Sequence, residues 1–218
     1  MSTYLDWGHK QISGNDPIEA AILYDQGYLF TRKFKGDMYR SRSVRIVLAD
    51  FYLSSENKRV LKKTEGLSVS SLQLPLSSYD WKIHKMGKDF YQNKFQDISF
   101  SAAKIRSLIN DPEASNFNVL FQYSMADTIL GYAISYDNPT LIHYAYPFYD
   151  YLNYSNNFGM AMMLKAILFA QEANKQYVYI GSLSRARDVY KLQFKGLQWF
   201  DGETWKNDID EAKKIIKE

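Results

Sequence analysis

The chain has 218 residues, of which 46% are hydrophobic, 23% charged and 16% aromatic, and its formal net charge is +3. This composition is typical of a globular protein that is long enough to bury a substantial core. There is no cysteine, which excludes disulfides, thiolate zinc sites and a cysteine nucleophile.

The first seventy residues combine short elements with much positive charge. Residues 16–27 predict a helix, because a proline stands at an early position and a glycine at the end. Residues 28–32 and 43–51 are apolar and read as strands. Residues 54–66 predict a second helix, with serines at its start and Gly66 at its end.

Between Arg32 and Lys63, ten lysines and arginines stand against three acidic residues, a local charge of +7, whereas the rest of the chain sums to −4. In the second predicted helix, Lys58, Arg59, Lys62 and Lys63 form one basic face. Such a concentration indicates a surface for a polyanion, and the alternative is a face that is only solvated.

The remaining residues predict a mixed α/β fold. Residues 70–78 read as a loop and a hinge. Helices are predicted at 85–97 and 100–110, strands at 118–125, 129–136 and 140–148, a long helix at 157–174, a strand at 177–181, a helix at 184–194 and a strand at 197–200. The first three strands should form an antiparallel meander. The long helix should pack on the sheet through Met160, Leu164, Ile167 and Leu168.

The N-terminus has no apolar signal segment, and the most apolar run, residues 158–170, is too short to cross a bilayer and contains Lys165. We therefore expect a soluble cytoplasmic protein with no membrane partner.

The order of elements from residue 118 onward, together with "NNFGMA" at the start of the long helix, resembles the GNAT acyltransferase fold. Gly159 and Ala161 fit the family's loop, Q/R-x-x-G-x-G/A, and Asn156 stands where the family has Gln or Arg. Glycine lets a phosphate or carbonyl approach the backbone, and the amides at a helix N-terminus favour negative charge. The resemblance implies a donor site comprising Asn156, Asn157, Phe158, Gly159 and Met160. A simple helix-entry turn is the alternative. The expected division is a basic segment, 1–69, and a GNAT-like domain, 70–218, in one compact unit.

Several motifs resemble a narrower family, the arginyl- and leucyl-tRNA–protein transferases. Residues 28–66 resemble that family's N-terminal region, "YPFYDY" (146–151) resembles its "YxFYDP", and residues 178–205 match its later motif at Gly181, Tyr190, Lys191, Phe194 and Trp205. The family's cysteine-rich connector is replaced by the cysteine-free "KFKGDMYRSRS", so no metal centre is inferred. The three histidines, His9, His84 and His143, also lack metal-ligand spacing.

This resemblance implies an enzyme that moves an amino acid from charged tRNA to the α-amine at an acceptor protein's N-terminus. Because the donor ester is already activated, no cofactor is expected. Asp150 would position or deprotonate the amine, and Tyr190 would protonate the leaving ribose oxygen. Lys191 would contact the donor. The basic helix would contact tRNA phosphates, and Arg32, Lys33, Lys35 and Arg40 would extend that surface or bind an acidic acceptor residue. Structural roles remain open for Asp150 as a turn residue and for Tyr190 as a core residue.

Two other functions fit the same residues. One is an N-acyltransferase of the acetyl-CoA type that uses "NNFGMA" for the pyrophosphate. The other is a catalytically silent relative that binds RNA or peptide.

Overall fold

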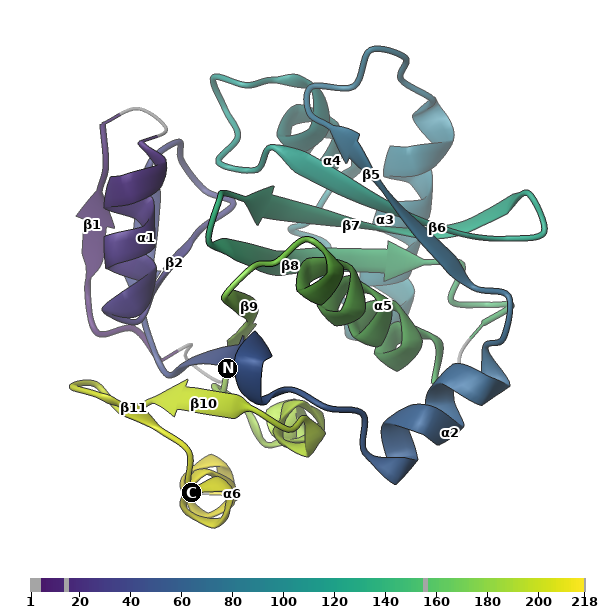
Figure 1. The fold of residues 1–218 in the computed structure, drawn as a ribbon. Helices are drawn as coiled ribbons and strands as arrows, with labels where there is room; N and C mark the ends of the chain where they lie inside the picture. The colour runs from purple at the N-terminus through teal and green to yellow at the C-terminus, as the bar shows by residue number, and fades with distance from the viewer. Residues whose placement is uncertain (1–4, 14–15, 155–156, 218) are drawn as a thin grey trace. The chain divides into compact units, whose positions relative to one another are not determined.

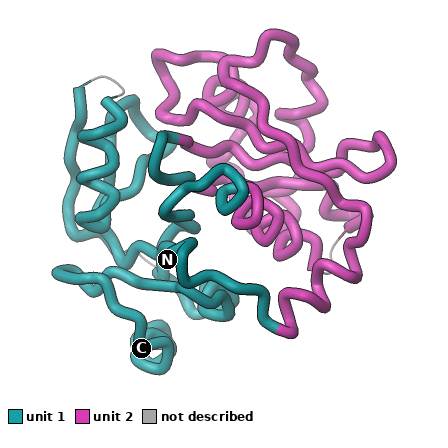
Figure 2. Tube along the Cα trace, viewed as in Figure 1, with its two compact units in different colours: residues 1–54, 138–143, 170–218 teal, residues 55–137, 144–169 magenta. Residues whose placement is uncertain are grey.

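The computed structural model describes residues 5–13, 16–154 and 157–217 (Figure 1). The chain forms two compact units (Figure 2). Unit 1 comprises residues 1–54, 138–143 and 170–218, and unit 2 comprises residues 55–137 and 144–169. Strand β8 (Leu141–Tyr149) and helix α5 (Phe158–Glu172) contribute residues to both units. The division at residue 69 stays a prediction.

Unit 1 contains the N-terminal elements and the C-terminal ones. Its elements are β1 (His9–Gln11), α1 (Pro17–Asp25), β2 (Tyr28–Phe30), β3 (Asp37–Arg40), β4 (Ser43–Val47), the 3₁₀ helix η1 (Leu48–Asp50), β9 (Tyr177–Ser182), the 3₁₀ helix η2 (Ala186–Gln193), β10 (Leu197–Phe200), β11 (Trp205–Lys206) and α6 (Ile209–Lys217). Strands β1, β3 and β2 form a small antiparallel sheet in that order.

Unit 2 contains α2 (Ser55–Lys63), β5 (Ser68–Gln73), α3 (Trp81–Phe95), α4 (Ala102–Asn110), β6 (Val119–Met125) and β7 (Thr128–Asp137). The order of strands in the main sheet is β11-β10-β4-β9-β8-β7-β6-β5. Strands β8 and β9 pair in parallel, and α5 lies between them in the chain. The fold is therefore mixed α/β with a largely antiparallel sheet and a GNAT-like order of elements, as the sequence predicts.

The predicted meander is confirmed, since β6, β7 and β8 are neighbours in sequence and in the sheet. The predicted loop at 70–78 is wrong in its first part, because β5 pairs with β6 along its whole length, from Ser68 with Ser124 to Gln73 with Val119. Strand β5 lies at the sheet edge and is mostly exposed, so its serines can replace the apolar residues that mark a buried strand. The predicted helix at 184–194 forms as the 3₁₀ helix η2.

The two faces of the unit 2 sheet carry different helices. A Cβ at Gly131 in β7 would lie 2.8 Å from Tyr149 Cβ and 3.1 Å from Met162 Cε in α5. A Cβ at Gly87 in α3 would instead approach Phe148, 3.4 Å away. Since neighbouring residues of a strand point to opposite faces, α5 covers one face and α3 the other (Figure 1).

Of the four residues predicted to pack α5 on the sheet, Leu164 and Ile167 are fully buried, whereas Met160 and Leu168 are half-buried. Ala161 and Met162 are also fully buried. The apolar surface of α5 is wider than one stripe, which makes a single packing face hard to choose from the sequence.

His9 joins the N-terminal residues to β3 and is expected to titrate above its ordinary range. Its Nδ1 lies 2.9 Å from Asp37 Oδ1 and its Nε2 lies 2.7 Å from Asp6 Oδ2. The hydrogen bond to Asp37 is the main cause that raises the pKa of His9, and the bond to Asp6 adds to it. The stabilisation is therefore complete below the unfolded pKa of about 6.5 and is lost as pH rises through the folded pKa.

An NMR titration of the His9 ring should give a midpoint above 6.5. Replacing Asp37 with Asn should lower that midpoint more than replacing Asp6 with Asn, since Asp37 is the larger cause. A wild-type midpoint at or below 6.5 would contradict the imidazolium bridge.

Candidate active site at the start of helix α5

The predicted donor motif lies in unit 2, between the end of β8 and the start of α5. Asn156 lies outside the described residues. Asn157 has a left-handed backbone with φ of 61°, and Phe158 is the first residue of α5. Phe158 is buried, with its ring centroid 5.1 Å from that of Tyr149. The strand end and the helix start are therefore joined by aromatic packing.

Gly159 lies directly against Tyr149. A Cβ at position 159 would be 3.3 Å from Tyr149 Cε1 and 3.6 Å from its hydroxyl oxygen. A larger side chain would have to displace this buried tyrosine or fill the space beside its hydroxyl. The absence of a side chain at Gly159 thus keeps the first turn of α5 accessible next to a phenol. Met160 follows and is half-buried.

Asp150 follows Tyr149 and organises the turn that leaves β8. Its carboxylate accepts hydrogen bonds from Asn153 Nδ2 at 2.7 Å and from the Asn153 amide at 3.3 Å. Its own amide donates to Leu130 O at 3.0 Å. These bonds show the turn role for Asp150 that the sequence leaves open. Asp150 is half-buried and directly follows Tyr149 in the chain.

Lys94, near the C-terminus of α3, completes the cluster and is not predicted from the sequence. Its Nζ donates to the Tyr149 hydroxyl at 3.0 Å. Four rings surround this ammonium, with centroids 5.0 Å away for Phe90 and Tyr149 and 5.5 Å away for Phe95 and Tyr151. These four residues are called the aromatic box below.

Burial shifts the pKa of both partners in the Lys94–Tyr149 hydrogen bond. Partial burial of the ammonium lowers the pKa of Lys94, while the facing rings favour its charged form. Burial raises the pKa of Tyr149 to about 12, and Tyr151 adds to the effect. The Tyr149 hydroxyl is therefore protonated at neutral pH. Since it accepts from Lys94, its own proton is available to a further acceptor.

The other two predicted site residues lie in unit 1. Tyr190 is 44% exposed, so it is not a core residue. Lys191 is buried, with Nζ donating to Ser182 O at 2.7 Å and lying 3.5 Å from Asp188 Oδ1. Burial lowers the pKa of Lys191, and Asp188 opposes that shift. Gly181, with φ of 88°, makes room for this ammonium, because a Cβ there would lie 3.3 Å from Nζ. The observed contacts of Lys191 are structural, and its donor role stays a prediction.

The basic residues divide between the two units. On α2 in unit 2, Lys58, Arg59, Lys62 and Lys63 are all exposed, and Arg59 forms an ion pair with Glu56 in the same helix. In unit 1, Lys33 is exposed and Arg32, Lys35 and Arg40 are half-buried. Arg40 Nε donates to Gln26 O at 3.0 Å, and its guanidinium lies over the rings of Tyr28 and Phe200. The α2 set is thus the more available for a polyanion.

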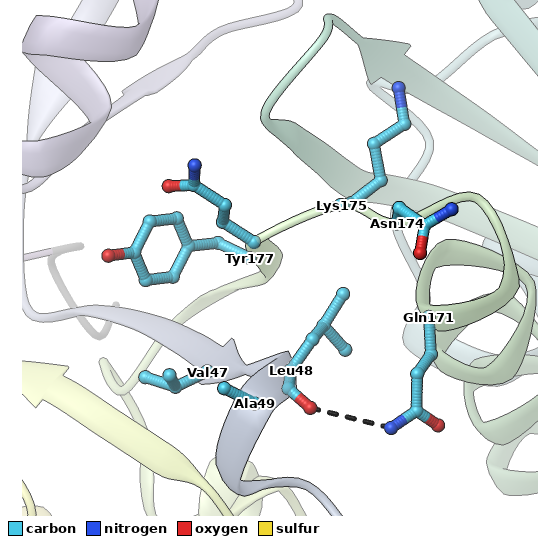
Figure 3. A pocket seen from close by; sticks show the side chains of 8 residues that line it. Val47, Leu48, Ala49, Gln171, Asn174, Lys175 and Tyr177 are labelled. Carbon is cyan, nitrogen blue, oxygen red and sulfur yellow. Dashed lines mark hydrogen bonds between the residues drawn. The ribbon is translucent and has the colours of Figure 1, made fainter.

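A pocket of about 420 Å³ lies in unit 1 (Figure 3). It is lined by residues 47–49, Gln171 and residues 174–177. Two of its polar side chains are engaged already, since Gln171 Nε2 donates to Leu48 O at 3.4 Å and Lys175 Nζ donates to Asn138 O at 2.6 Å. Of the sequence-predicted site residues that the structure describes, none lines it.

Among the described residues, His, Asp and Glu side chains form no group of three or more that could hold a metal ion. In the same part of the chain, no helix has the length and apolar character needed to cross a bilayer.

No family model matches the chain, and a search of curated proteins finds no match. Solved structures give three likenesses. The C-terminal domain of a protein assigned as a lysylphosphatidylglycerol synthetase from Agrobacterium fabrum is 12% identical, with a TM-score of 0.49 over 95% of this chain and 70% of that one. The L-PGS of Bacillus licheniformis is 10% identical, with a TM-score of 0.49 over 92% and 70%.

The third likeness is to a GCN5-related glucosamine N-acetyltransferase region in a fungal multi-domain GH3 β-N-acetylglucosaminidase. It is 9% identical, with a TM-score of 0.49 over 91% of this chain and 23% of that one. At identities of 9–12%, none of the three transfers an activity or a substrate to this chain.

Proposed function

We propose that the protein is an aminoacyltransferase that moves an amino acid from charged tRNA to the α-amine of an acceptor protein. The observation that carries the proposal is the cluster at the start of α5. There the accessible first turn at Gly159, the buried Tyr149 hydroxyl and the Lys94 ammonium lie together. The sequence motifs shared with tRNA–protein transferases and the exposed basic helix α2 support the choice of donor.

In the proposed reaction the acceptor amine attacks the ester carbonyl of the donor. A C–N bond forms, the ester C–O bond breaks, the amine loses a proton and the ribose oxygen gains one. The ester supplies its own activation, so the reaction needs no cofactor. The site has to hold both reactants, accept the proton and stabilise the carbonyl oxygen as its charge develops.

Residues at the end of β8 and the start of α5 suit these tasks. The amides in the first turn of α5 favour negative charge on the carbonyl oxygen, and Gly159 allows close approach. Asp150 accepts or orients the amine proton. Tyr149, whose raised pKa keeps it protonated, donates to the leaving oxygen beside Gly159. Tyr190 is the other phenol proposed for that donation, and its exposure leaves it accessible to a substrate.

Thermal unfolding with two ligands, charged tRNA and acetyl-CoA, tests the proposal. Charged tRNA with a non-hydrolysable amide link should raise the Tm by about 5–10 °C at a hundred times its Kd, because it binds only the folded chain. Acetyl-CoA should leave the Tm unchanged. Stabilisation by acetyl-CoA alone would establish the acyl-CoA alternative. Stabilisation by tRNA without transfer of a labelled amino acid to a peptide would establish the silent relative.

Replacing Gly159 with Leu should abolish donor binding while the protein still folds. The new side chain would project against Tyr149, only 3.3 Å from the position of its Cβ, and would fill the space beside the first turn of α5. The Tm shift with charged tRNA should disappear. Glu172→Leu, an exposed substitution at the other end of the same helix, is the matched control and should keep it. Equal donor binding by both variants would show that the glycine only eases helix entry.

A further inference from the structure

Lys94 is held by aromatic rings rather than by a carboxylate. Its Nζ is within 5.0–5.5 Å of the four ring centroids of the aromatic box, inside the range of about 6 Å in which a ring face attracts a cation. Its hydrogen bond goes to a neutral phenol, Tyr149. Within the described residues, no carboxylate forms an ion pair with Lys94. The box thus holds an ammonium ion with neutral groups alone.

The rings also fix one another, so the box does not depend on Lys94 for its shape. Phe90 lies 4.7 Å from Tyr149, 5.7 Å from Phe95 and 6.2 Å from Tyr151, centroid to centroid. Tyr149 and Phe90 are buried, which anchors two of the walls. Phe95 is 37% exposed and Lys94 is exposed as a residue, so the box opens to solvent. Another cation could enter from that side.

We infer that the aromatic box is a binding site for an organic ammonium ion, which Lys94 occupies until such a ligand displaces it. The identity of the natural ligand rests on the proposed function, under which the ligand is the α-ammonium of the acceptor protein. Tyr149 forms one wall of the box and also borders Gly159. An ammonium ion bound in the box would therefore lie next to the position proposed for the donor carbonyl.

Tetramethylammonium is the probe, because it binds aromatic faces without donating a hydrogen bond. Lys94→Ala should bind it on the order of five- to ten-fold more tightly than the wild type, since the internal competitor is gone. Adding Tyr151→Ala to Lys94→Ala should weaken that binding. The uncharged tert-butyl alcohol, of similar shape, should not bind. Calorimetry or NMR titration gives the affinities.

Equal affinity of the wild type and Lys94→Ala would show that Lys94 does not compete for the box. Equal binding of tert-butyl alcohol would show a merely apolar cavity. Either result, or no binding to a folded Lys94→Ala, overturns the inference. Tetramethylammonium binding is measured without the aminoacyl donor. A protein that binds charged tRNA but not tetramethylammonium would therefore contradict the ammonium site and leave the proposed function standing.

A second measurement on the wild type keeps the inference testable if the variants do not fold. Tetramethylammonium should displace Lys94 into solvent and raise its rate of acetylation by acetic anhydride. Lys88, exposed on the same helix, is the internal reference and should not change. A Lys94 rate that stays constant relative to Lys88 at saturating probe would overturn the inference.

Discussion

Acidification from pH 6.5 to pH 4.5 should lower the free energy of unfolding by about 2–3 kcal/mol through His143 alone. His143 is 3% exposed, and the Tyr24 hydroxyl lies 2.8 Å from its Nδ1. Burial, with a smaller effect from Lys191, lowers the pKa of His143 to about 3. In the unfolded chain a histidine has a pKa of about 6.5.

The sign follows from which state binds the proton. Between about pH 3 and pH 6.5 the unfolded chain binds a proton at His143 and the folded chain does not, so acid favours unfolding. The slope is about 1.4 kcal/mol per pH unit. His9 acts in a different window, because its pKa is raised and its contribution changes only above about pH 6.5.

Urea unfolding at a series of pH values measures this slope. His143→Gln should lower the stability at pH 7 and flatten the slope between pH 4.5 and 6.5. His9→Gln is the matched control, and it should keep the wild-type slope in that window. If His143→Gln and the wild type have the same slope, His143 accepts a proton in the folded state.

How far the sequence predicts the fold depends on the length and burial of each element. Helix α5 and strands β6 to β8 are long and apolar, and their predicted positions agree with the structure to within a few residues. Strands β1, β3 and β11 have only two to four residues, too few to show a period, so the sequence does not predict them. They form because partners elsewhere in the chain supply their hydrogen bonds, as when β3 pairs with both β1 and β2.

The residues of the candidate site also differ in how far the sequence predicts them. Asp150 and Gly159 belong to local motifs, so the sequence could single them out and the structure finds both at the β8–α5 connection. Lys94 could not be singled out, since it is 55 residues from Tyr149, to which it donates. In sequence it is one of many lysines on an amphipathic helix. Its environment arises only when α3 packs beside the end of β8.

Replacing the four basic residues of α2 with glutamine should greatly weaken tRNA binding and reduce its dependence on salt. Lys58, Arg59, Lys62 and Lys63 are exposed on one short helix, whose buried residues are Asn57 and Val60. Each phosphate contact releases about 0.9 counterion on duplex nucleic acid. Because Arg59 is already paired with Glu56, we expect the slope of log K against log salt to fall by about three units rather than four.

A slope difference of about three units means that the affinity gap between wild type and variant narrows about 60-fold between about 50 and 200 mM salt. The matched control replaces four other exposed lysines, Lys82, Lys85, Lys88 and Lys213, and it changes the net charge equally. It should keep most of the wild-type slope, because long-range charge is screened beyond about 10 Å at moderate salt. Both variants should unfold within about 2 kcal/mol of the wild type, as expected for exposed sites. Equal slopes for the two variants would show that tRNA responds to net charge and that α2 is a solvated helix.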